Sequence, residues 1–132
     1  MLEKYLAGAA VGDTPKLDVA QDGYTITCMK AIYFVGGSRE DLRDFPKSAK
    51  HEAGVDLMRL QNGLEPRSWK PMPAVGKGAR EIRERVAEGI FRVFYVVESA
   101  EAVYVLHAFQ KKTQKTSQAD IDLGKDRYKS IR

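Results

Sequence analysis

Residues 79–109 read AREIRERVAEGIFRVFYVVESAEAVYVLHAF and contain three successive β-strand patterns, AREIRERV (79–86), IFRVFYVV (90–97) and AVYVLHAF (102–109). The second and third are rich in the β-branched and aromatic residues that favour strands. The connections AEG and ESAE are short enough for hairpins, and Gly89 suits a turn position with positive φ. This stretch therefore predicts an antiparallel meander, in which AVYVLHAF, apolar on both faces, is a central strand.

Upstream of the meander, residues 38–62 predict two short helices separated at Pro46, a residue that fits the first turn of a new helix. Ser38 is expected to cap the first helix and Gly63 to end the second. The second helix presents one apolar stripe at spacings of three and four, made of Phe45, Ala49, Ala53, Leu57 and Leu60. Residues 65–78, with three prolines and two glycines, predict a loop with at most an edge strand.

Downstream, residues 117–131 predict a last helix capped by Ser117, with Gly124 as a weak point costing about 1 kcal/mol relative to alanine. A first strand is expected at MKAIYFV (29–35), with the alternative that YTIT (24–27) lengthens it. The order strand, two helices, meander and helix predicts an α+β fold, with helices on one face of a mainly antiparallel sheet.

The 132 residues suffice for one domain. Residues 29–132 are expected to form it, and residues 1–28, which lack sustained periodicity, to be an extension of uncertain status or an over-long start. The single cysteine, Cys28, fits a reducing compartment, and no apolar run approaches the roughly 18 residues that cross a bilayer. We expect a cytoplasmic protein without membrane contact.

Positive charge is concentrated in the second part of the chain. Residues 1–28 carry a net charge of −2, and residues 29–132 carry +6. Between Arg67 and Lys115 there are ten basic and five acidic side chains. Such an excess favours a polyanionic partner, although an ordinary solvated surface is the alternative.

Alternation along the strands places Glu81, Arg83 and Arg85 on one wholly charged face. Arg92 is a lone cation in an apolar row, so it is expected either to pair with Glu81 or Glu84 or to face a phosphate. His107 shares an apolar face and is more typical of a satisfied core residue than of a catalyst. The two distant histidines and the absence of a cysteine cluster predict no metal site, and no cofactor motif is present.

The pattern MKAIYFVGGSREDLRDFP, the three meander strands, the segment QKKTQKT and the closing DIDLGKDRYK resemble the phage-derived HigB-like branch of the RelE/ParE toxin superfamily. The resemblance covers roughly residues 29–132. It implies a compact antiparallel sheet with two packed N-terminal helices. It also implies a type II toxin that cleaves mRNA on the ribosome and is bound by a helix-turn-helix, HigA-like antitoxin. DNA would be contacted only through that antitoxin. A gyrase inhibitor and an inactive antitoxin-binding module are the alternatives.

RNA cleavage by the 2′-hydroxyl, without a metal, needs cations around the scissile phosphate and a base, which a lysine with a lowered pKa can provide. The candidate catalytic residues are Arg83, Lys111, Arg85, Lys112, Arg92 and His107. The candidate RNA-binding or phosphate-binding residues are Arg80, Lys70, Lys77, Gln110, Thr113 and Lys115. For the lysines, a solvated loop is the alternative. The hypothesis requires the cations of the hairpin and of the last strand to converge in space.

Overall fold

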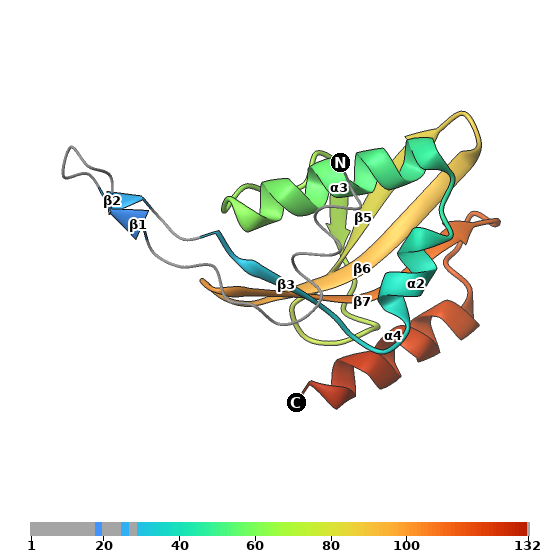
Figure 1. Cartoon of the computed structure of the whole chain (residues 1–132). Coiled ribbons are helices and arrows are strands. Elements are labelled where there is room, and N and C mark those ends of the chain that lie inside the picture. Colours follow the sequence, from blue (N-terminus) through green and yellow to red (C-terminus); the bar gives the residue numbers. More distant parts are fainter. Residues whose placement is uncertain (1–17, 20–24, 27–28, 132) are drawn as a thin grey trace.

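The computed structural model describes residues 18–19, 25–26 and 29–131 (Figure 1). Its elements are β1 (Asp18–Val19), β2 (Thr25–Ile26), β3 (Ala31–Phe34), α2 (Ser38–Arg43), α3 (Lys47–Gln61), β4 (Trp69–Pro71), β5 (Ala79–Val86), β6 (Gly89–Ser99), β7 (Ala102–Lys111) and α4 (Gln118–Ser130). β1 and β2 pair with each other, so Thr25–Ile26 does not lengthen β3. Most of the proposed extension, including Cys28, lies outside the described residues.

The predicted meander is present and forms most of a five-stranded sheet with the order β3-β7-β6-β5-β4. Gly89 has a φ of 137° at the turn between β5 and β6, as expected. Residues 65–78 contribute only the short edge strand β4, which is also as expected. The sheet is mixed, however, because β3 pairs in parallel with β7 from Ala31–Ala102 to Phe34–Val105. The fold class is therefore α+β, and the sheet is antiparallel except at this edge.

One face of the sheet packs against α3. The predicted stripe on α3 is confirmed, since Ala49, Ala53 and Leu57 are almost fully buried. They pack on Ile82, Val93, Tyr95 and Val105 of the sheet in one apolar cluster. At the start of α3, the rings of Phe45 and Phe91 lie 4.8 Å apart between centroids. This cluster fixes the sheet against the helix and leaves the opposite face for α4.

The opposite face packs against α4, so the expectation of helices on one face only is wrong. Here Phe94, Val96, Leu106 and Phe109 form a second apolar cluster with Val75 and α4. Gly124 is buried where α4 meets Phe94, and a Cβ at this position would lie 2.8 Å from Phe94 Cδ2. The glycine is therefore required by close packing and is not merely a weak point in the helix.

The helix caps follow the sequence in one case and depart from it in the other. Ser117 caps α4 as predicted, its Oγ accepting a hydrogen bond from the backbone N–H of Asp120 at 3.2 Å. Ser38 does not cap α2; it is buried, and its hydroxyl donates to the carbonyl of Val105 at 3.0 Å. Ser38 thus ties the start of α2 to β7, which is a tertiary contact that local sequence rules do not anticipate.

Candidate nucleic-acid interface

Five cations lie on the α4 face of the sheet, beyond the part that α4 covers. In the strand register, Arg83 lies opposite Arg92 and Arg85 lies opposite Ile90. Ile90 in turn lies opposite Lys111, and Lys70 lies opposite Glu81. Directly paired residues point to the same side of a sheet, as do residues two apart on a strand. We call Lys70, Arg83, Arg85, Arg92 and Lys111 the cationic cluster. The convergence that the sequence hypothesis required is thus a feature of the fold.

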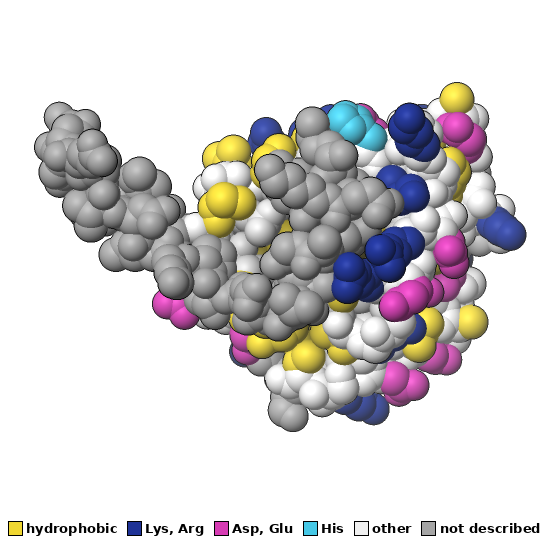
Figure 2. Space-filling view, in the orientation of Figure 1, with side chains coloured by type: hydrophobic (Ala, Val, Ile, Leu, Met, Phe, Trp, Pro, Cys, Tyr) yellow, Lys and Arg dark blue, Asp and Glu magenta, His cyan; other side chains and the backbone are white. Residues whose placement is uncertain are grey.

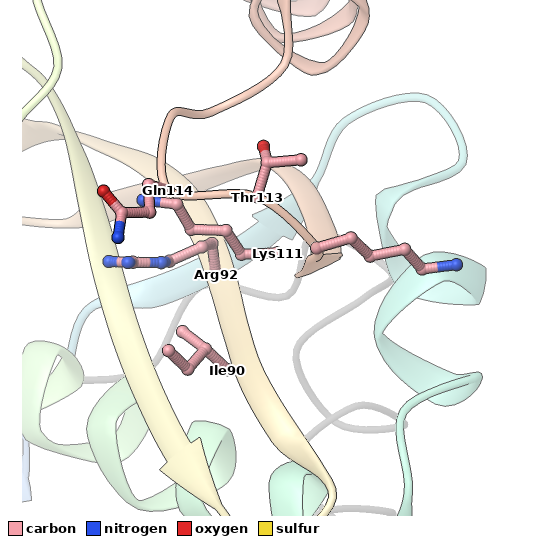
Figure 3. A pocket seen from close by; sticks show the side chains of 6 residues that line it. Ile90, Arg92, Lys111, Thr113 and Gln114 are labelled. Atoms are coloured by element: carbon pink, nitrogen blue, oxygen red, sulfur yellow. The ribbon is translucent and has the colours of Figure 1, made fainter.

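Two hollows adjoin the cationic cluster. The first, of about 550 Å³, is lined by Ile90, Arg92, Lys111, Lys112, Thr113 and Gln114. In Figure 3 the Arg92 side chain lies between those of Gln114 and Ile90. The second, of about 250 Å³, shares Ile90 and Arg92 and extends past Arg83 and Arg85 to the edge of β5. The first hollow is lined by cationic and polar side chains around Ile90, whereas the wall of the second also contains three acidic residues, Glu52, Asp56 and Glu84.

The cationic cluster is built around a buried carboxylate. Glu81 is fully buried, and its Oε1 lies 3.0 Å from Arg92 Nη1 and 3.7 Å from Lys70 Nζ. Its Oε2 accepts a hydrogen bond from the Thr116 hydroxyl at 3.2 Å. Of the two acidic partners foreseen for Arg92, Glu81 is therefore the one that pairs with it. Glu81, Arg83 and Arg85 share one charged face as expected, and within that face Glu81 is buried.

Two members of the cationic cluster have lowered pKa values, caused by desolvation and by neighbouring positive charges. Partial desolvation is the main cause of a lowered pKa at Lys111, and Arg92, Lys70 and Arg83 act in the same direction, while Glu81 opposes them. The pKa of Arg92 is lowered chiefly by burial, with Glu81 opposing. Lys111 is the more accessible of the two. It combines a position at the hollow with a lowered pKa, as a lysine base requires.

Several candidate residues lie near the cationic cluster without belonging to it. Lys112 and Thr113 line the first hollow. Lys112, Thr113 and Lys115 line a further hollow of about 280 Å³ with Ser117 and Asp120. The Thr113 hydroxyl donates to the carbonyl of Lys115, which closes a tight turn. The segment 112–117 thus continues the basic surface from the end of β7 to the start of α4.

Three other candidates lie apart from the cationic cluster. Arg80 is paired with Tyr95 and so points to the α3 face, where it stacks on Trp69 at 4.2 Å and pairs with Glu65 at 3.0 Å. Lys77 lies by the last turns of α4, since its carbonyl accepts from the Tyr128 hydroxyl. Gln110 is paired with Phe91, and its amide donates to the carbonyl of Glu88 at 3.3 Å.

His107 is held between two carboxylates. Its Nε2 lies 2.7 Å from Asp120 Oδ1 and its Nδ1 lies 3.4 Å from Asp41 Oδ2, with the ring stacked on Phe109. The side chain is nearly buried, and Asp41 also pairs with Arg127 of α4 at 2.9 Å. This arrangement joins α2, β7 and α4. The geometry favours a structural role for His107 over a catalytic one.

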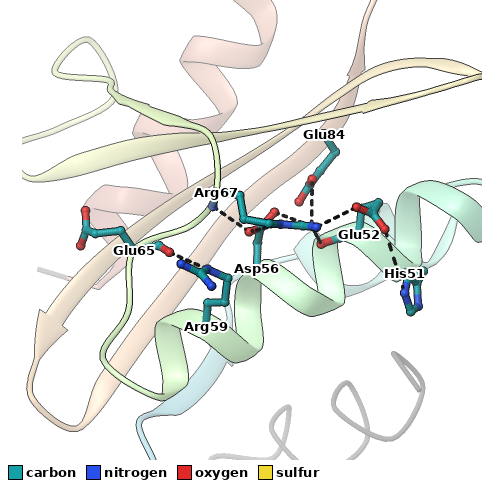
Figure 4. A network of polar contacts seen from close by, with 7 residues as sticks. All are labelled: His51, Glu52, Asp56, Arg59, Glu65, Arg67 and Glu84. Carbon is teal, nitrogen blue, oxygen red and sulfur yellow. Dashed lines mark hydrogen bonds and ion pairs between the residues drawn. The ribbon is translucent and has the colours of Figure 1, made fainter.

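A second ionic network lies on the α3 face and lines part of the second hollow (Figure 4). Arg67 pairs with Asp56 at 3.1 Å and with Glu52 at 3.0 Å, which fastens the loop after α3 to that helix. Glu84 is buried beside them, 3.9 Å from Arg67. Burial and then the neighbouring Asp56 raise the pKa of Glu84 to about 9. Hence Glu84 is a neutral acid at neutral pH.

Basic side chains are not confined to the cationic cluster. In the view of Figure 2, Lys and Arg side chains also follow the surface beside α3 and α2, with acidic side chains among them. The cationic cluster differs from that surface because its members share one face in the strand register, because Arg92 and Lys70 pair with one buried carboxylate, and because the other three members and Arg92 line hollows. Among the described residues, no group of three or more His, Cys, Asp or Glu side chains is placed to hold a metal ion.

A comparison with protein families places the chain in one of them. A model of the family described as Phage derived protein Gp49-like (DUF891) matches residues 40–129, well over half of the chain. The chain belongs to the Gp49-like family. This family is associated with RelE-like toxins, in agreement with the coarse form of the resemblance. The match includes all five members of the cationic cluster as well as Glu81. No curated protein matches the sequence.

The residues that organise the Gp49-like site were foreseen only in part. Glu81 was one of the two acidic partners expected for Arg92, because an arginine in an apolar row needs an acid in reach. Its contact with Lys70 was not expected, and Thr116, Gln114 and Asp120 were not among the candidate residues. The contact from Thr116 had no such signal in the sequence, since it depends on how the chain turns between β7 and α4.

In the described ranges, no helix is long and apolar enough to span a membrane.

Proposed function

We propose that this Gp49-like protein is the toxin of a type II toxin–antitoxin system, of the HigB-like branch, and that it cleaves mRNA on the ribosome. The observation that carries the proposal is the cationic cluster in cross-strand register beside two hollows. Its guanidinium groups are suited to phosphate oxygens, because arginine presents a planar fork of donors. A cytoplasmic location and a neighbouring helix-turn-helix antitoxin complete the proposal.

The cleavage step requires only groups that the cationic cluster contains. The 2′-hydroxyl gives its proton to the Lys111 amine, and its oxygen bonds to phosphorus while the bond to the 5′-oxygen breaks. The products are a 2′,3′-cyclic phosphate and a 5′-hydroxyl, which forms when the leaving 5′-oxygen takes up one proton from the solvent. Arg83, Arg85 and Arg92 stabilise the charge on the phosphorane and on the leaving oxygen.

Lys111 is assigned as the base because its pKa is lowered where the reaction needs a neutral amine. Lowering the pKa increases the fraction of unprotonated amine near neutral pH. The exposed Lys112, Thr113 and Lys115 would contact neighbouring phosphates or bases. Binding through several phosphates should weaken steeply as salt concentration rises.

The test is expression of the chain without an antitoxin, followed by primer extension on cellular transcripts. We expect growth arrest and cuts within translated codons. The double variant Arg83→Ala, Lys111→Ala should lose both effects, while the folded protein still binds the antitoxin. A matched control, Lys125→Ala with Lys129→Ala, removes two exposed cations of α4 and should remain toxic.

Three outcomes would count against the proposal. Intact transcripts in arrested cells, with induced DNA damage and co-purified gyrase, would favour the gyrase inhibitor. Tolerated overexpression without an antitoxin would favour an inactive antitoxin-binding module. A fully toxic Arg83→Ala, Lys111→Ala variant would show that the site assignment is wrong even where transcripts are cut.

A further inference from the structure

A fully buried carboxylate under a phosphate-binding surface calls for an explanation. A carboxylate repels phosphate, and burying a charge is costly unless it is paired and hydrogen-bonded. Glu81 meets that condition, because its two oxygens have partners on three different segments: Arg92 on β6, Lys70 on β4 and Thr116 before α4. The carboxylate therefore joins β4, β6 and the segment before α4 to β5 at this end of the sheet.

We propose that Glu81 is a positioning residue, which orients Arg92 toward the first hollow and holds the segment 112–117 against the cationic cluster. This inference rests on the proposed function for its consequence in catalysis, but not for its geometry. Arg92 is only 6% exposed, lines the first hollow, and has its Nη1 held 3.0 Å from Glu81 Oε1. The Thr116 contact places Lys112 and Thr113 along the same hollow.

Glu81 has a second effect, on the proposed base. The groups that face Lys111 are Arg92 on β6, Arg83 and Glu81 on β5 and Lys70 on β4. Glu81 is the one anion in this set, and it moderates the mutual repulsion of the cations. Replacing its charge with a neutral group should let the lysine amine lose its proton at lower pH, because only like charges then remain.

The experiment compares the full-length wild type with Glu81→Gln, which keeps the shape of the side chain. The pH titration of the Lys111 amine is followed by competitive acetylation and mass spectrometry of the Lys111 peptide. We expect its midpoint to move to lower pH in Glu81→Gln. The control Glu101→Gln removes an exposed carboxylate of the turn between β6 and β7 and should leave the midpoint in place. An unchanged midpoint in folded Glu81→Gln would overturn the proposal.

A second variant covers the case in which Glu81→Gln does not fold. Thr116→Val keeps the side-chain volume and removes only the hydroxyl that donates to Glu81. Amide hydrogen exchange of residues 112–116 should become roughly fivefold faster, as expected for the loss of one hydrogen bond. Ser130→Ala, which removes a hydroxyl at the far end of α4, serves as the control. Unchanged exchange in Thr116→Val would contradict the holding role.

Cleavage assays separate this inference from the proposed function. If wild type cleaves RNA, the pH dependence of cleavage in Glu81→Gln should move together with the Lys111 titration. If no RNA is cleaved at any pH, while the Lys111 midpoint moves in Glu81→Gln and exchange of residues 112–116 rises in Thr116→Val, the proposed function fails and the positioning role stands. If cleavage occurs but its pH dependence does not follow Lys111, the role of Glu81 in setting the base is wrong.

Discussion

Glu81 and Glu84 lie three residues apart on β5, and both are buried, but they point to opposite faces of the sheet. Glu81 faces the cationic cluster, where Arg92, Lys70 and Thr116 contact its two oxygens. Glu84 faces α3, and its Oε2 has no hydrogen-bond partner among the described residues. The same residue type, at similar burial, is thus an ion-paired carboxylate on one face and a neutral acid on the other.

The difference shows that a buried acid is kept charged or neutral by the cationic partners available to it and not by burial alone. On the α3 face the available guanidinium is Arg67, and it is engaged by Asp56 and Glu52. Glu84 therefore meets burial and the negative Asp56 with little compensation, and its pKa rises to about 9. On the α4 face, the five cations of the cationic cluster exceed the one carboxylate, Glu81, that is buried among them.

The largest expected effect comes from breaking the ion pair on the α4 face. Arg92→Leu leaves Glu81 buried without its main partner, which should lower the free energy of unfolding by about 3–5 kcal/mol. Urea unfolding followed by circular dichroism at pH 7 measures it. The double variant Glu81→Leu, Arg92→Leu should recover most of the loss, because a well-packed apolar pair replaces the ion pair. A double variant as unstable as Arg92→Leu would contradict this account.

The second prediction concerns the α3 face and depends on pH. The pKa of Glu84 is about 9 in the folded protein and 4.5 in the reference state. Its contribution to stability is therefore fully present below pH 4.5 and is lost as pH rises toward 9 and above. Glu84→Gln keeps a neutral, isosteric side chain and should be more stable than wild type at pH 9, with the difference shrinking toward pH 6. Thermal unfolding across this range measures it, and Glu101→Gln should retain the wild-type slope.

The sequence was sufficient for features that depend on local pattern. The meander, the stripe from Ala49 to Leu60 and the Ser117 cap follow from alternation, helical spacing and capping chemistry, and all are present. The shared face of Arg83 and Arg85 followed from alternation along one strand. Their convergence with Lys111 was required by the hypothesis, and the register that produces it was not predicted.

The remaining features depend on contacts between distant segments. The parallel pairing of β3 with β7 joins residues about 70 positions apart, and nothing in MKAIYFV specifies its direction. Ser38 bonds to Val105, and Thr116 to Glu81, across similar or smaller separations. Such contacts are set by packing, because the local signals for a cap or a loop are equally satisfied without them.

The third prediction concerns Gly124→Ala, for which helix propensity and the packing in the structure predict opposite changes in stability. Helix propensity alone predicts that Gly124→Ala stabilises α4 by about 1 kcal/mol. The structure places the new methyl group within 2.8 Å of the fully buried Phe94. Overpacking should therefore destabilise the protein by about 1–3 kcal/mol. The exposed Ala119→Gly variant on α4 is the control for propensity and should cost about 1 kcal/mol. A stabilised Gly124→Ala would show that α4 packs less closely.

The smallest expected effect lies at the start of α4. Ser117→Ala removes the hydroxyl that caps the helix and contacts the Asp120 carboxylate, the partner of His107. We expect a loss of about 1 kcal/mol in urea unfolding. The exposed Ser130→Ala should change stability by less than about 0.5 kcal/mol. Equal effects of the two substitutions would contradict the capping role.

The place of β7 inside the sheet has a consequence for synthesis of the chain. β7 leaves the ribosome after β3 and β6, yet it lies between them and supplies the lysine that completes the cationic cluster. A growing polypeptide therefore holds two unjoined halves of a sheet until this strand is released. The surface that we propose binds RNA is therefore complete only once β7 has joined β3 to the rest of the sheet.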